Sequence, residues 1–230
     1  FKQKTAYEIR LSLVGSEMCI RDRSTRIPVT IKIRTGWDSE CINALEIVRV
    51  AADSGVQWVA IHGRTRAQGY SGLADWDLIG NVKAKSPIPI IGNGDLQTAA
   101  LAVQRYRETG VDAVLIGRGA LRNPFIFKQA NRIISGEEEF RPTAEDYLEL
   151  LRVQKKLLEE ESKAVCLLHG KKFLSWYSAG FRNSSQFRKE VFSLKTSEDV
   201  WSLGVRFFEE NLTDRNLLFL EEAFLMGGHG

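Results

Sequence analysis

IPIIGNGD at residues 88–95 and DAVLIGRG at residues 112–119 each place an apolar strand before a glycine turn that leads into a helix-like stretch. A glycine turn followed by a helix N-terminus gathers free backbone N–H groups at one point, which suits a phosphate. Two such turns on consecutive strand–helix units are typical of the phosphate grip near the last two strands of a (β/α)8 barrel. The pair therefore predicts an enzyme that binds a cofactor or nucleotide phosphate.

Four strand-like runs recur along the chain and are separated by helical patterns. They are rich in Val and Ile without alternation, as expected for parallel strands that are covered on both faces. Four strand–helix units make half of an eight-stranded barrel, and the two phosphate-type turns favour its second half. A doubly wound open sheet is the alternative. The runs are Val29–Ile33, Trp58–His62, Ile88–Gly92 and Asp112–Gly117.

The pattern changes after Ser135. The polar stretch GEEEFRP (136–142) predicts a linker, and Thr143 then begins a helix with Asp146 placed for a capping-box contact. Further helical patterns cover residues 163–181, 183–193 and 197–225.

These patterns predict an α/β chain, the second half of a (β/α)8 TIM-type barrel over residues 27–135 followed by an all-α helical domain over residues 143–230. Residues 1–26 have no clean period of 2 or 3.6 and are interpreted as a leader of non-native sequence.

Composition is that of an ordinary globular protein, with 43% hydrophobic and 27% charged residues. The net charge of +3 is too small to imply nucleic-acid binding by itself. No apolar run approaches the roughly 18 residues of a transmembrane helix, so we expect no membrane contact. Cys19, Cys41 and Cys166 are odd in number and lack metal-ligand spacing. They predict reduced thiols in a cytoplasmic protein without a metal site.

Charged residues occupy the first two predicted strands. Lys32 lies inside the apolar strand VTIKIR (29–34), where an unpaired buried charge is costly. On a barrel strand this lysine points inward at the mouth, toward an anionic or electron-rich ligand, and a lysine on an exposed edge strand is the alternative. The stretch HGRTR (62–66) ends the second strand, where the active sites of such barrels lie. Its histidine and two arginines are candidates for binding a phosphate or polarising a carbonyl.

The two glycine turns supply the candidate phosphate residues. Asn93, Gly94 and Asp95 form the first turn, and Gly117 and Arg118 form the second. Arg118 adds the capacity for charge-assisted hydrogen bonds. For Asp95, capping of the following helix is the alternative role.

The predicted helical domain has a local excess of positive charge. Six basic residues and no acidic one occur from Lys163 to Lys189, and Trp176 and Tyr177 lie among them. Basic groups interleaved with aromatic rings can follow a phosphate backbone and stack on bases. A solvated helix face with Trp176 in the core is the alternative.

Five motifs together resemble the bacterial tRNA-dihydrouridine synthases over about residues 27–195. IHGRTR with YSG and ADW distinguishes that family from other FMN barrels such as the dihydroorotate dehydrogenases, which share the phosphate grip alone. The motifs are VTIKIRTGWD (29–38), VAIHGRTRAQGYSGLADWDLI (59–79), IPIIGNGD (88–95), VDAVLIGRGALRNPFIF (111–127) and HGKKFLSWYSAGF (169–181).

The resemblance implies an FMN-binding barrel followed by a helical tRNA-binding domain. It implies that particular uridines of tRNA are reduced to dihydrouridine, with FMN recharged by NADPH. The implied FMN-binding residues are Lys32, His62, Asn93, Gly94, Asp95, Gly117 and Arg118. The implied substrate and tRNA contacts are Arg64, Arg66, Lys171 and Lys172.

The resemblance also implies that the first half of the family's barrel, with its catalytic cysteine, is missing. None of the three cysteines takes the place of that residue, so no catalytic residue is named and the chain is expected to be inactive alone. Two alternatives stay open: a non-catalytic RNA-binding fragment, and another FMN- or phosphate-binding barrel oxidoreductase that acts on a small molecule.

Overall fold

The computed structural model describes residues 27–211 of the chain. Within them, residues 27–96 and 101–117 form one compact unit, and residues 97–100 and 118–211 form a second. The predicted leader and the last part of the helix expected over residues 197–225 lie outside the described residues.

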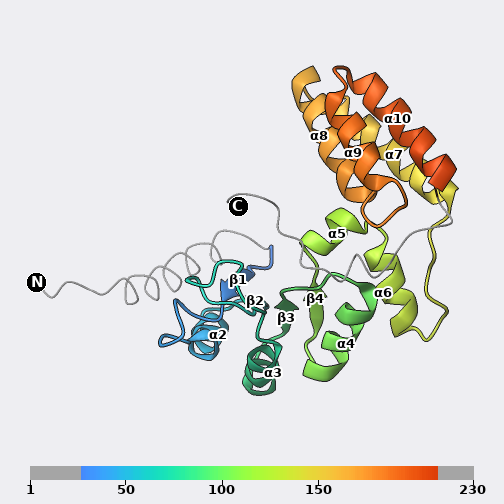
Figure 1. Cartoon of the computed structure of the whole chain (residues 1–230). Helices are drawn as coiled ribbons and strands as arrows, with labels where there is room; N and C mark the ends of the chain where they lie inside the picture. Colours follow the sequence, from blue (N-terminus) through green and yellow to red (C-terminus); the bar gives the residue numbers. More distant parts are fainter. Residues whose placement is uncertain (1–26, 212–230) are drawn as a thin grey trace, which may run out of the picture. The chain divides into compact units, whose positions relative to one another are not determined.

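The first unit is built on a parallel sheet whose strands follow the order β1-β2-β3-β4. Helices α2, α3 and α4 connect them and lie on the same side of the sheet (Figure 1). The strands are β1 (Ile31–Arg34), β2 (Val59–His62), β3 (Ile90–Asn93) and β4 (Ala113–Leu115). The helices are α2 (Ala44–Asp53), α3 (Trp76–Lys85) and α4 (Ala99–Thr109).

The strand order distinguishes the two architectures that the sequence left open. In a doubly wound sheet the order reverses and helices cover both faces, whereas a (β/α) barrel adds each strand beside the last with its helix outside. Four strands in sequential order with helices on one side match the barrel. The prediction of an α/β partial barrel is confirmed.

Alternate residues of the strands face the helices. Val59, Ile61 and Ile90 are fully buried in one core with Val48 of α2 and Ile79 of α3. Successive side chains of a strand point to opposite faces, so the residues between them face away from the helices. By register, this second face carries the rows Lys32, Ala60, Ile91, Ala113 and Arg34, His62, Asn93, Leu115.

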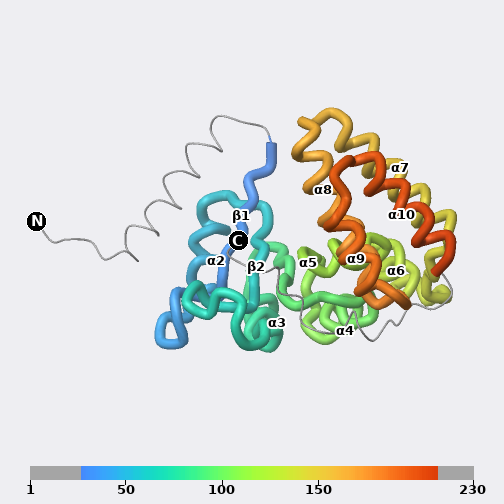
Figure 2. The backbone as a smooth tube through the Cα atoms, turned by 45° about the horizontal axis from the view of Figure 1, so that its top comes forward, coloured from blue at the N-terminus to red at the C-terminus, as the bar shows by residue number. Residues whose placement is uncertain are grey.

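The second unit is helical. α10 packs along both α7 and α8, and α8 contacts α9 (Figure 2). The predicted capping box at α7 is confirmed, because Thr143 Oγ1 accepts a hydrogen bond from the Asp146 backbone and the Asp146 carboxylate accepts one from the Thr143 backbone. The helices are α5 (Arg118–Arg122), α6 (Ile126–Ile134), α7 (Ala144–Leu158), α8 (Lys163–Tyr177), α9 (Ser184–Ser193) and α10 (Ser197–Asn211).

The structure groups residues 118–134 with the helical unit, whereas the sequence predicted that the half-barrel extends to residue 135. Aromatic contacts account for the difference. The Phe125 ring lies 5.9 Å from that of Phe140 and 5.0 Å from that of Tyr147. Gln129 Nε2 also donates to the Phe140 carbonyl at 3.0 Å, so α6 is joined to the segment that leads into α7.

Among the described residues, no helix has both the length and the apolar character needed to cross a membrane. Residues 27–211 also hold no group of three or more His, Cys, Asp or Glu side chains arranged to bind a metal ion.

Candidate active site at the strand ends

The sheet face that points away from the helices carries a polar row at the carboxyl ends of the strands. Arg34, His62 and Asn93 are register partners on β1, β2 and β3. Lys32 lies one row earlier on the same face and is exposed. Because Ile31 and Ile33 pack into the helix-side core, the alternation of β1 directs Lys32 to this face. The ligand contact expected of Lys32 stays a prediction.

His62 is a half-buried imidazole that stays neutral near pH 7. Burial is the largest cause that lowers the pKa of His62, from 6.5 to about 4. The other causes are charges: Arg34, Arg64 and Lys32 lower the pKa, and Asp95 raises it. A neutral imidazole offers one hydrogen-bond donor and one acceptor, so His62 can orient a ligand without adding charge.

The turn after β3 has backbone geometry that glycine alone fits. Gly94 has a φ of 134°, and a Cβ there would lie against Ala74 and 3.2 Å from Cδ2 of His62. The Asn93 side chain donates from Nδ2 to the Leu115 carbonyl at 2.6 Å, which joins β3 to β4. A Cβ at Gly92 would collide with the Trp76 ring, whose Nε1 donates to the Gly94 carbonyl at 3.0 Å.

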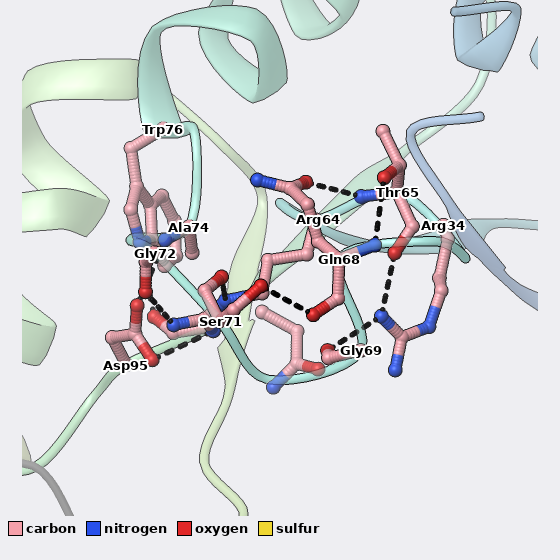
Figure 3. Close-up of polar contacts among 12 residues, drawn as sticks. Arg34, Arg64, Thr65, Gln68, Gly69, Ser71, Gly72, Ala74, Trp76 and Asp95 are labelled. Carbon is pink, nitrogen blue, oxygen red and sulfur yellow. Dashed lines mark hydrogen bonds and ion pairs between the residues drawn. The ribbon is translucent and has the colours of Figure 1, made fainter. Parts of the chain in front are cut away.

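Arg64 lies inside the protein rather than on its surface, with 3% of its side chain exposed. Nη1 contacts Asp95 Oδ1 at 2.8 Å, Nη2 donates to the Gly72 carbonyl at 2.6 Å, and Nε donates to the Ser71 carbonyl at 3.1 Å (Figure 3). The other Asp95 oxygen accepts from the Ala74 backbone at 2.8 Å. The tRNA contact expected of Arg64 stays a prediction, and the structure gives this side chain three partners within the protein.

Arg34 is a site residue that the sequence reasoning missed. Its Nη1 donates to the Thr65 carbonyl at 2.8 Å and to the Gly69 carbonyl at 2.9 Å (Figure 3). The period of two along β1 was the available signal, because it places Arg34 on the same face as Lys32.

Arg66 differs from Arg64 in its exposure. Its guanidinium lies 6.0 Å from the centre of the Trp37 ring, and Trp37 is 49% exposed. Arg66 itself is exposed, so its predicted contact with substrate is sterically open.

The second glycine turn follows β4. Gly117 is exposed, and a Cβ added there would meet no atom within 4 Å, so its backbone is open to a ligand. Arg118 begins α5, which belongs to the second unit. The phosphate contacts expected of Gly117 and Arg118 stay predictions.

The two lysines predicted to contact tRNA have different surroundings. Lys171 Nζ donates to the Phe192 carbonyl at 3.1 Å and to the Leu194 carbonyl at 2.6 Å, at the end of α9. Lys172 is exposed on α8. The structure therefore gives Lys171 a role in ending α9, and Lys172 keeps its charge at the surface.

Comparison with known proteins supplies the family. The model of the family described as "Dihydrouridine synthase (Dus)" matches residues 19–215. This chain belongs to the dihydrouridine synthase family. In the "Probable tRNA-dihydrouridine synthase" of Rickettsia conorii, 38% of 170 aligned residues are identical, covering 73% of this chain and 51% of that protein.

Two further members of the family show the same partial coverage. The "Probable tRNA-dihydrouridine synthase 1" of Synechocystis is 35% identical over 174 residues, 75% of this chain and 49% of that protein. The "tRNA-dihydrouridine synthase B" of Xanthomonas campestris is 36% identical over 195 residues, 81% of this chain and 57% of that protein. The chain spans about half the length of the curated relatives it matches.

Proposed function

We propose that this chain forms the flavin-binding and RNA-binding part of a tRNA-dihydrouridine synthase, an enzyme that reduces uridines of tRNA with FMN and NADPH. The observation that carries the proposal is the strand-end face of the first unit. There, exposed Lys32 and neutral His62 lie on adjacent rows beside a turn at Gly94 that no side chain could enter. Membership in the family supports this assignment. A tRNA substrate also places the proposed enzyme in the cytoplasm.

The residues of this face fit FMN. Lys32 and Arg34 make the face positive, which suits a phosphate and an electron-rich ring. The backbone at Gly117 allows close approach, because a Cβ there would meet no atom within 4 Å. At Gly94 the place of a Cβ is taken by Ala74 and lies beside the His62 ring, so this glycine lets those two residues pack at the turn. The Asp95 carboxylate would repel a phosphate, but its two oxygens are held by Arg64 and the Ala74 backbone. In this proposal Asp95 therefore holds the turn in place and does not contact the phosphate.

Each residue has a physical role in the reaction. FMN, when bound, would supply a hydride to C6 of uracil, and the proton that completes the reduction at C5 would come from the family's cysteine, which the resemblance places in the half of the barrel that this chain does not match. The Lys32 ammonium stabilises negative charge on the bound ring and so lowers the barrier to reduction. His62 presents a neutral imidazole that orients the ring by a hydrogen bond. NADPH is the proposed reductant that restores the flavin.

A fusion protein tests the proposal. The part of the Rickettsia conorii relative that this chain does not match is joined ahead of this chain, in the order that the resemblance implies. We expect the purified fusion to retain FMN, shown by flavin absorbance, and to form dihydrouridine in tRNA from a synthase-deficient strain when NADPH is added. Lys32→Ala should lower flavin retention or the rate of NADPH-driven flavin reduction, and Lys85→Ala on α3 is the control.

The two remaining functions predict different outcomes of the same experiment. A non-catalytic RNA-binding protein would bind tRNA and form no dihydrouridine. A small-molecule oxidoreductase would retain FMN and bind no tRNA. Either result would overturn the proposed function.

A further inference from the structure

The loop that follows β2, residues 63–75, is named here the strand-end loop. It leaves the end of β2 at Gly63 and returns to α3 at Asp75. The end of the loop lies beside its start, because the Asp75 backbone donates to the Gly63 carbonyl at 2.6 Å. A Cβ at Gly63 would lie 2.8 Å from that same Asp75 nitrogen, so a glycine is required at this point.

An ion pair between buried Arg64 and partly buried Asp95 joins this loop to the turn after β3. Arg64 holds the outer part of the loop through the carbonyls of Ser71 and Gly72. The same guanidinium contacts Asp95, which in turn accepts from the Ala74 backbone near the loop's end. Figure 3 shows the Arg64 side chain between Ser71 and Gly72 of the loop and Asp95 of the turn.

The loop's end forms part of the wall around His62. Ala74 and the His62 ring both lie against the place where a Cβ of Gly94 would stand. The charged groups that face this imidazole are Lys32 and Arg34 of β1, Arg64 of the loop, and Asp95 of the turn. Displacing Ala74 would open the ring to water.

We propose that Arg64 and Asp95 are a positioning pair that closes the strand-end loop over His62 and keeps its imidazole buried and fixed against Gly94. The biological purpose of the pair rests on the proposed function, in which the flavin ring would contact a fixed, neutral imidazole. The pair itself touches neither flavin nor uridine in this account.

The test compares two effects of opposite sign in Asp95→Asn. Asn tolerates the positive φ of 53° at this position, but its Nδ2 donor replaces one of the two carboxylate oxygens and faces either Arg64 or the Ala74 N–H, so the two contacts cannot both persist in this geometry. Loss of the carboxylate charge alone would move the pKa of His62 below about 4, because Asp95 raises it. Release of the loop would instead hydrate the ring and raise that pKa toward 6.5. We expect a rise of about one unit, read from the imidazole resonances of the full chain in a pH titration by NMR.

Arg64→Lys is the second variant. Lysine keeps the positive charge but cannot contact three partners in the plane of a guanidinium, so a rise in the pKa of His62 reports the loop and not the charge. Hydrogen exchange of residues 63–75, measured by mass spectrometry, should also accelerate by at least about tenfold if the pair's loss allows the loop to open locally.

Asp112→Asn is the matched control. Its carboxylate contacts Lys83 at 2.6 Å and the Ile90 backbone at 2.7 Å in the same unit, at the amino ends of β3 and β4. The Asp112→Asn substitution should leave both the pKa of His62 and the hydrogen exchange of the strand-end loop unchanged. A fall of that pKa in Asp95→Asn, or unchanged loop exchange in Arg64→Lys, would overturn the proposal. Neither measurement needs FMN or RNA, so a fusion that forms no dihydrouridine would contradict the proposed function while these results still support the pair.

Discussion

The strand-end region of the first unit and the core of the helical unit are held together by different forces. At the strand ends, Arg34 and Arg64 donate to backbone carbonyls and to Asp95, and glycines allow the segments to approach. In the helical unit, aromatic rings fill the core. The rings of Tyr147 and Phe208 stack at 4.7 Å and 7°.

The difference shows that basic residues that look equivalent in the sequence can have different structural roles. A basic side chain that donates to several groups of the protein, such as Arg64, has few hydrogen-bond donors left for a ligand. In the helical unit, where aromatic packing forms the core, a lysine such as Lys172 stays exposed and is accessible to a ligand. Exposure and hydrogen-bond partners, rather than charge alone, therefore separate structural cations from candidate ligand contacts.

The largest expected effect tests the aromatic side of the comparison. Phe208 is fully buried, and Phe208→Ala removes a stacked ring and leaves a cavity. We expect a loss of about 4 kcal/mol in the free energy of unfolding, measured by urea denaturation followed by circular dichroism. Val205→Ala on the same helix, at a 36% exposed position, should cost less than about 1 kcal/mol. Equal losses in the two variants would contradict the assigned core.

The next effect tests the ionic side. Arg64→Ala leaves the Asp95 carboxylate, which is 20% exposed, without its guanidinium partner, and we expect breaking this partly buried ion pair to cost about 2 kcal/mol. Arg66→Ala, two residues away and exposed, should change the unfolding free energy by less than about 0.5 kcal/mol. Urea denaturation of the two variants measures this contrast. If both arginines proved equally dispensable, Arg64 would not be a structural cation.

A smaller effect separates the two adjacent lysines of α8. Lys171→Ala removes two hydrogen bonds to carbonyls at the end of α9, and we expect a loss of about 1 kcal/mol because the site is partly exposed. Lys172→Ala should be neutral within about 0.5 kcal/mol. Denaturation curves of the two variants under one buffer condition provide the measurement, and a reversed order would contradict the assignment.

The last effect is absent at neutral pH and develops only in acid, as a pH dependence from His62. Its pKa is about 4 in the folded chain and 6.5 in the unfolded reference, so the unfolded state binds more protons between these values. His62 therefore lowers stability as pH falls from 6.5 to 4, and the loss is complete below 4. His62→Asn should lose less stability than the parent chain between pH 7 and pH 4.5. Parallel slopes in denaturation experiments at several pH values would show that His62 is not buried in this way.

Much of the fold was predictable, because its signals are local. Runs of Val and Ile with glycine stops gave the four strands, and Thr143 with Asp146 gave the start of α7. The unit boundary was not predictable in the same way. It depends on contacts between Phe125, Phe140 and Tyr147, which are distant in the sequence and have no periodic signature.

The shared face of Lys32 and His62 could be predicted from the sequence, but the partners of the long side chains could not. Strand alternation was sufficient to place Lys32 and His62 on one face. It could not show that Arg64 contacts Asp95, which lies 31 positions later, or that Lys171 ends α9. Hydrogen-bond partners of long side chains depend on which segments the fold brings together, and the spacing of residues carries no information on that.

The affinity of the chain for tRNA as a function of salt concentration tests most directly the proposal that exposed Lys172 contacts RNA, whereas Arg64 and Lys171 have hydrogen-bond partners within the protein. Each phosphate contact releases about one counterion, so Lys172→Ala should weaken binding and reduce the slope of log K against log salt by about one. Arg64→Lys, which keeps its charge inside the protein, should leave the slope unchanged. An unaltered slope in Lys172→Ala would contradict the account.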